Sequence, residues 1–246
     1  MGLLSWVKEK CQNIKEGIKT VLHEVKVKTA DAVNRLADRT KEWKGKLENT
    51  IERARYKLGV IISPKPTYIP STDEKQKAQE CINIIKQTFP TGIKNTLMNQ
   101  RPEERLETIQ DFTKRTIRAM NLTDVKLEIE NLGASTMGGL NPETNEITLN
   151  AAPIACDNPE LMEEQVFTVI HELTHKRQID AIKDYANGKS IDKYGYSEMQ
   201  IYEFAKNWKY YINPHENQEG YRKQPIENYA YGFEDYVKAL YRDINC

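Results

Sequence analysis

The sequence lacks a long apolar run and a net charge, and each absence excludes a class of protein. The longest apolar stretch, Leu58–Ile62, is far shorter than the roughly 18 residues needed to span a bilayer, so we expect no transmembrane segment. The 36 basic residues are balanced by 36 acidic ones. A chain without net charge has no overall field to hold nucleic acid, so we expect no nucleic-acid partner.

The first residues also lack the features of targeting signals. Charge arrives at Lys8, before an apolar segment is complete, so the sequence predicts no secretory signal peptide. A myristoylation site needs Ser or Thr at the sixth position, where Trp6 stands. The four cysteines are scattered and include no Cys-x-x-Cys pair. We therefore predict reduced, structural cysteines and a cytoplasmic protein.

Residues 1–62 are predicted to form a long amphipathic helical arm. They contain no proline, and residues 1–60 carry 14 Lys and Arg against 8 Asp and Glu. Apolar residues spaced three and four apart form an a/d seam of the coiled-coil type, namely Leu4, Val7, Cys11, Ile14, Ile18, Val21 and Val25. After a change of register the stripe continues through Val33, Leu36, Trp43 and Leu47. Such a stripe needs a cover, and the candidates are a helical partner or second copy, the protein's own domain, or a membrane surface.

Residues 63–73 contain three prolines within seven residues and are predicted to form an extended linker. The linker leads to a predicted domain over 74–246. Asp73 is the expected N-cap of a helix over 74–89, and further helices are predicted over 102–120, 159–186, 197–211 and 225–241. Alternation of apolar and polar residues predicts strands near 125–130 and at 146–150. The predicted fold class is α+β, mainly helical with a small antiparallel sheet.

Two of the four histidines lie in the sequence His171-Glu172-Leu173-Thr174-His175 on the predicted helix 159–186. Histidines at positions i and i+4 lie one turn apart on one helix face, so both imidazoles can bind one ion. Glu172, next to the first histidine, is placed to take a proton from a metal-bound water. With this composition, chance predicts roughly 0.007 occurrences of the motif.

The segment around this motif resembles the active-site helix of zinc metallopeptidases of the zincin class. The resemblance implies that His171 and His175 bind one Zn²⁺ per chain and that Glu172 is the general base. A metzincin would continue as His-x-x-Gly-x-x-His, but Gln178 and Ala181 stand at the Gly and last His positions. That subclass is therefore excluded, and the sequence resembles the gluzincins more closely.

A zinc site of this type needs a third protein ligand. The preferred candidate is Glu227, in the first turn of the predicted helix that begins at Pro225. Its Pro-x-Glu-x-x-Ala context resembles the second helix of peptidases whose first helix reads His-Glu-Leu-x-His-x-x-Gln. Glu203 and His215 are the alternative third ligands. The competing explanation of Glu227 is an ordinary acid in the first turn of a helix, where it complements the helix dipole and binds no metal.

Further polar residues are candidates for supporting roles. Glu234, seven residues after Glu227 and on the same helix face, is a candidate acceptor for the N–H of a ligand histidine, and so is Asp180. An ordinary solvated acid is the favoured interpretation of both. Tyr229 or Tyr231 is a candidate hydrogen-bond donor to an oxyanion, although packing is the favoured interpretation for any single tyrosine.

Together these features predict a zinc-dependent peptidase acting on a protein or peptide. Glu172 would be the general base, and strand 146–150 would pair with an extended substrate. The alternative is a non-catalytic, metal-stabilised interaction protein whose arm, residues 1–60, mediates self-association, docking on an assembly or membrane-surface binding. In a third interpretation the arm regulates the peptidase.

Overall fold

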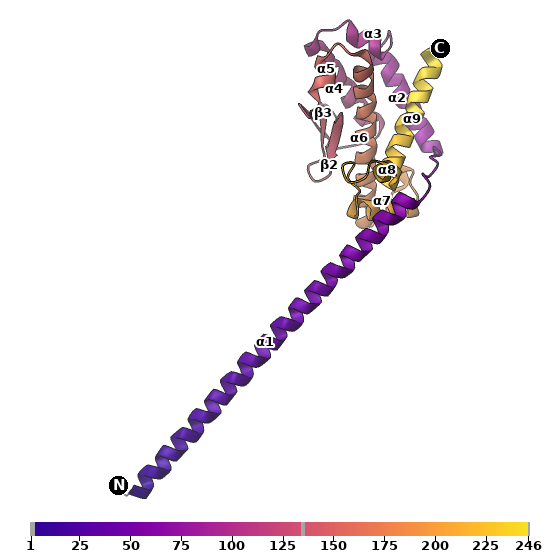
Figure 1. The fold of residues 1–246 in the computed structure, drawn as a ribbon. Coiled ribbons are helices and arrows are strands. Elements are labelled where there is room, and N and C mark those ends of the chain that lie inside the picture. The colour runs from indigo at the N-terminus through magenta and orange to yellow at the C-terminus, as the bar shows by residue number, and fades with distance from the viewer. Residues whose placement is uncertain (1–2, 134–135, 246) are drawn as a thin grey trace. The chain divides into compact units, whose positions relative to one another are not determined.

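The computed structural model describes residues 3–133 and 136–245 and divides the chain into two units. The first extends to Tyr56 and the second begins at Lys57. The predicted boundaries at 62/63 and 73/74 stay predictions. Helix α1, Leu3–Ile62, is continuous across the division (Figure 1). The side chains of six seam residues lie outside the described part of the chain: Leu4, Val7, Cys11, Ile14, Ile18 and Val25.

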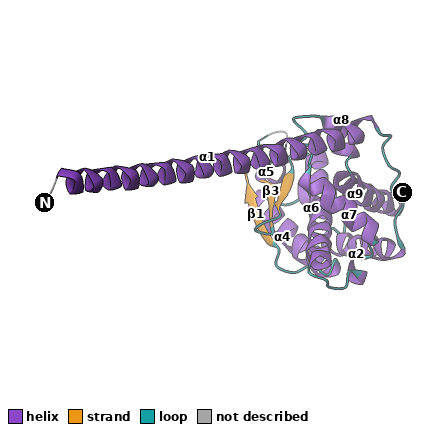
Figure 2. Ribbon diagram, turned by 90° about the horizontal axis from the view of Figure 1, so that it is seen from below, coloured by secondary structure: helices purple, strands orange, loops and turns teal. Residues whose placement is uncertain are grey.

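The second unit confirms the α+β, mainly helical fold class (Figure 2). Its elements in chain order are α2 (Thr72–Thr88), α3 (Ile93–Met98), α4 (Pro102–Ala119), β1 (Lys126–Glu130), β2 (Gly138–Asn141), β3 (Glu146–Asn150), α5 (Ala151–Ala155), α6 (Pro159–Ala186), the short 3-10 helix η1 (Asp192–Tyr194), α7 (Glu198–Lys209), α8 (Gln218–Lys223) and α9 (Pro225–Asn245). The five longer helices after the linker and the strands at 126–130 and 146–150 match the predicted segments within a few residues. The sequence reading missed α3, β2, α5, η1 and α8.

The sheet is mixed, which corrects the expected antiparallel arrangement. Its strand order is β1-β3-β2, with β3 parallel to β1 and antiparallel to β2. The hairpin forms because the Asn141 side chain accepts from the backbone N–H groups of Glu143 and Thr144, and Asn145 adopts a φ of 57°. Since β3 is paired on both sides, strand 146–150 has no free edge for a substrate. That edge belongs to β2.

Helix α6 lies at the centre of the second unit, between the sheet and the pair α2 and α9 (Figure 1). Asn158 caps it by accepting from the N–H groups of Glu160 and Leu161, and Pro159 occupies its first turn. Every residue from Gln165 to Ile179 is buried. A helix buried on all sides has polar residues inside the molecule, and those of α6 need partners there.

Residues 63–73, the predicted linker, belong to the second unit and contact its helix α2. Residues 64–71 have no regular secondary structure, but the Tyr68 hydroxyl donates to Glu74 at 2.7 Å. Ser71 caps α2 in a capping box with Glu74, which corrects the assignment of Asp73 as the cap. Asp73 pairs instead with the buried Arg177 of α6. Of the cysteines whose side chains are described, Cys81 and Cys156 are free thiols.

Candidate metal centre

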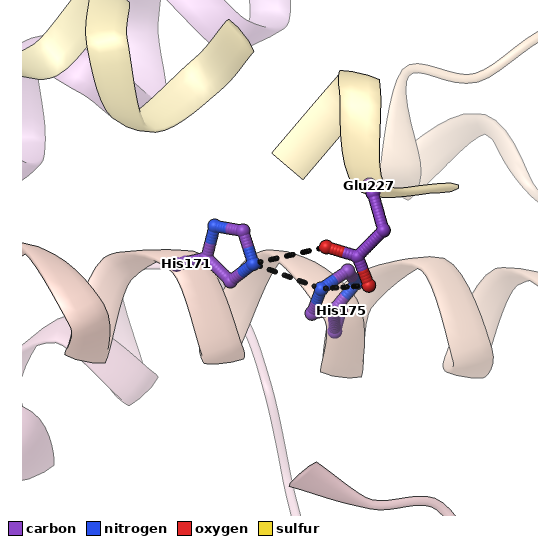
Figure 3. Close-up of side chains that lie close together, drawn as sticks. All are labelled: His171, His175 and Glu227. Atoms are coloured by element: carbon purple, nitrogen blue, oxygen red, sulfur yellow. Dashed lines mark hydrogen bonds and ion pairs between the residues drawn. The ribbon is translucent and has the colours of Figure 1, made fainter. Parts of the chain in front are cut away.

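The structure brings together the side chains of His171, His175 and Glu227 (Figure 3). The two histidines lie one turn apart on α6, and Glu227 enters from the first turn of α9. One ligand atom from each residue lies within 4.8 Å of the others. The Nε2 atoms of the histidines are 3.0 Å apart, and each lies 3.4 to 3.5 Å from a Glu227 oxygen. All three side chains are buried.

The other ring nitrogen of each histidine fixes its tautomer. His171 Nδ1 lies 2.9 Å from the Glu234 carboxylate, and His175 Nδ1 lies 2.9 Å from Gln178 Oε1. The Gln178 amide nitrogen donates to the Ile226 carbonyl at 3.0 Å, so its oxygen must face His175. Both Nδ1 atoms therefore carry hydrogen, and in neutral rings both Nε2 atoms present lone pairs to the space beside Glu227.

Glu227 adds a third acceptor to the same space. Its Oε1 accepts a hydrogen bond from the Tyr211 hydroxyl at 2.5 Å, whereas its buried Oε2 accepts none from the described residues. Three buried acceptors thus converge without a donor between them. Such an arrangement requires a positive charge, which either a metal ion or a proton can supply. Two imidazoles and one carboxylate are a donor set typical of zinc.

The pKa shifts show the same demand for positive charge. Burial lowers the pKa of His171, but the adjacent carboxylates of Glu227 and Glu234 outweigh it and raise the pKa to about 10. Burial also opposes charge on Glu227, yet His175 and His171 hold the pKa of Glu227 below its ordinary value. In the metal-free protein a proton on a histidine therefore neutralises part of the negative charge. A metal ion would compete with that proton.

Glu172 lies next to this group but outside it. Its side chain is buried, with 7% exposed, and it makes no hydrogen bond or ion pair with another described residue. Burial raises the pKa of Glu172, and the two histidines partly oppose that shift. Glu172 therefore lies beside the histidines as a carboxylate with a raised pKa, in the wall of two clefts.

Two clefts meet at Glu172. One, of about 460 Å³, is lined by His171, Glu172 and Tyr231, and the other, of about 180 Å³, by His175, Glu172 and Glu227. Gly138 of β2 and Tyr221 also line both. The residues of the candidate metal centre therefore line the two clefts together with Gly138 of the outer strand β2.

The helix that carries Glu227 is positioned by residues distant in sequence. Asn207 of α7 accepts from the Ile226 N–H at 2.9 Å and donates to Gln224 at 2.8 Å. Gln224 in turn bonds both backbone groups of Ile212. This buried network fixes the first turn of α9 and places Glu227 opposite the histidines.

The alternative candidates lie elsewhere. Glu203 is exposed on α7 and does not belong to the group. His215 is exposed and lines only the larger cleft. Asp180 pairs with Lys176, so the acceptor for His175 is Gln178. Glu234 faces His171 and is held on its other oxygen by Lys238 at 2.6 Å.

The tyrosines divide between two places. Tyr231 lines the larger cleft, with its ring 4.5 Å from that of His171, whereas Tyr229 packs edge-on against Tyr68. The sequence did not single out Tyr211 or Tyr221. Tyr211 lies between α7 and α8, and Tyr221 lies on α8. Their places in a tyrosine-rich segment carry no periodicity that marks them as site residues.

Comparison with known proteins gives no match: no family model fits the sequence, and no curated protein or solved structure is significantly similar to it. The interpretation of the site therefore depends on its own geometry.

Proposed function

We propose that the protein is a zinc-dependent peptidase whose metal centre is formed by His171, His175 and Glu227, with Glu172 as the general base. The observation that carries the proposal is the convergence of three buried acceptors beside Glu172, a carboxylate that lines both clefts. Zinc held by these residues would lower the pKa of an attacking water to about 7 and polarise a substrate carbonyl.

Each neighbouring residue then has a defined task. Glu172 accepts a proton from the attacking water and returns it to the leaving amine nitrogen, which its raised pKa favours. Glu234 and Gln178 hold the two imidazoles in the tautomer that exposes Nε2. Tyr211 holds the Glu227 carboxylate through Oε1.

The β2 edge supplies a binding surface for an extended peptide. Its outer side is unpaired among the described residues, and Gly138 and Gly139 line the smaller cleft with Glu172. A Cβ at Gly139 would meet no atom within 4 Å, so a substrate backbone has room to approach. Main-chain hydrogen bonds to this edge would hold a peptide across the metal centre.

The position of Glu172 favours this function over a metal that only stabilises the fold. A structural zinc site is closed by protein ligands and needs no carboxylate in a cleft beside it. The place of Glu172 in the wall of both clefts therefore supports catalysis over the non-catalytic interaction protein.

The test is Glu172→Gln, which keeps the size and polarity of the side chain but removes its basicity. We expect bound zinc to remain and hydrolysis of a mixed synthetic peptide library, followed by mass spectrometry, to fall at least about 100-fold. Glu203→Gln, at an exposed acid of α7 that lines neither cleft, is the matched control and should keep most of the activity. Full activity of Glu172→Gln with zinc bound would rule out the mechanism.

A further inference from the structure

Helix α1 carries an apolar stripe that is not covered by other residues of the first unit, which extends to Tyr56. Trp43 is 76% exposed, Leu36 64% and Leu47 60%, and Val21 and Val33 are exposed to a similar extent. The described part of the chain contains no helix long and apolar enough to cross a membrane. The charged residues on either side of the stripe indicate which kind of surface could cover it.

The apolar residues occupy one face of the helix. At about 100° per residue, Val21, Leu22, Val33, Leu36, Trp43, Leu47 and Ile51 fall within an arc of about 120°. Leu36 and Leu47, like Leu22 and Val33, are eleven residues apart. That spacing returns to the same face of a straight helix with a drift of only about 20°. Val27 is the exception, on the opposite face.

Charges on the same helix are sorted by sign. Between residues 15 and 56, every Lys and Arg except Lys41 lies within about 100° of the centre of the stripe. They form two flanking rows: Lys15, Lys19, Lys26, Lys44 and Arg55 on one side, and Lys28, Arg35, Arg39, Lys46 and Arg53 on the other. Every Asp and Glu, from Glu16 to Glu52, lies about 120° or more from that centre.

This arrangement has a specific physical use. Lys and Arg beside an apolar face can extend their aliphatic stems along it and place their charged ends at the level of lipid headgroups. The acidic residues then point away from the surface into water. We propose that residues 15–56 of α1 bind flat on an anionic lipid surface, with the apolar stripe in the headgroup–acyl boundary and both basic rows on lipid phosphates and carboxylates.

The charge pattern disfavours a second copy as the cover. In a two-stranded coiled coil, residues of opposite sign flank the seam and pair across it. Here both flanks are basic, so two copies would face like charges along the interface. Thr40 and Thr50 also lie within the stripe, where a sustained coiled-coil seam needs larger apolar residues.

The test uses the full chain and vesicles, and neither zinc nor hydrolysis enters it. Co-sedimentation is measured with vesicles of phosphatidylcholine alone and of phosphatidylcholine with phosphatidylserine. We expect binding to the anionic vesicles that weakens as sodium chloride is raised, and weak binding to the neutral ones that salt does not lower. These wild-type measurements do not depend on how any variant folds.

Two matched double variants then identify the face. Leu36→Asp with Leu47→Asp changes the stripe, and Asn34→Asp with Asn49→Asp makes the same change in net charge on the polar face. We expect the first pair to lower vesicle binding about tenfold or more and the second to lower it much less. Circular dichroism checks that both pairs keep the helix.

Three results would overturn the proposal. The first is equal binding to neutral and anionic vesicles, and the second is an equal loss in the two double variants. The third is a wild-type chain that sediments as a dimer, ignores vesicles, and becomes monomeric with Leu36→Asp and Leu47→Asp. That last result would assign the stripe to self-association.

Discussion

Replacing Glu227 by Gln tests the third ligand of the candidate metal centre. The two side chains have nearly the same shape, and the Gln oxygen can still accept the hydrogen bond from Tyr211. The amide N–H₂ would then take the place of Oε2, which lies 3.5 Å from His171 Nε2, while the Gln oxygen would stay beside His175. A donor would thus stand where the wild-type site has a third acceptor.

The magnitudes follow from that exchange. In the metal-free protein a buried carboxylate that pairs with a protonated histidine is replaced by a neutral amide, so we expect the free energy of unfolding to fall by about 3 to 5 kcal/mol near neutral pH. Zinc at one hundred times its dissociation constant stabilises the wild type by about 2.7 kcal/mol, which raises the melting temperature by roughly 5 to 10 °C. The variant should lose that increase because an amide is a poor zinc ligand.

The assay is thermal unfolding of the full chain, with zinc and with a chelator, beside elemental analysis of bound metal. Glu203→Gln, the same change at an exposed acid of α7, is the control and should keep both the zinc and the increase. Retention of the full zinc effect by Glu227→Gln, or its loss in Glu203→Gln, would refute the assignment of the third ligand. A wild type that zinc does not stabilise would refute the metal centre itself.

Three further predictions test the surroundings of the centre. The folded-state pKa of His171, about 10, lies above its ordinary value of 6.5. The metal-free protein should therefore have this stabilisation in full below pH 6.5 and lose it as the pH rises toward 10. Denaturant titrations in the presence of a chelator should show this loss, and the same titrations with saturating zinc should not. Gln178→Leu should lower zinc affinity about 10- to 100-fold in competition with a chromophoric chelator, and an unchanged affinity would contradict its role. Gly232→Ala should destabilise the protein by about 1 to 3 kcal/mol in urea unfolding, since the new Cβ would lie 2.2 Å from Tyr68 Cγ. The same penalty in a Tyr68→Ala background would disprove that cause.

Helices were predictable because their signals are local. Pro159 and Pro225 stand at the starts of α6 and α9, where proline is favoured because the first turn does not need its N–H. The same local geometry sets the relation of His171 to His175, since residues four apart always share a helix face. The correction at α2 is also local, because Ser71 with Glu74 is a complete capping box and Asp73 is not.

The sheet was less predictable because its pairing is not local. Strand β2 begins with Gly138 and Gly139, which have little strand propensity, and it forms because the Asn141 turn folds it onto β3. Strand β1 pairs in parallel with β3, although β2 lies between them in the sequence. No spacing in the sequence distinguishes this parallel pairing from an antiparallel one.

By itself the sequence determined the histidine pair, the adjacent Glu172, and the sorting of charge along α1, since each depends only on helical periodicity. Only the tertiary structure decided which distant acid meets the histidines. Glu203 and Glu227 lie 28 and 52 residues beyond His175, and packing of α9 against α6 brings in the more distant one. The partners of the Nδ1 atoms were decided in the same way, because a buried hydrogen bond depends on the positions of two helices and not on the residues of one.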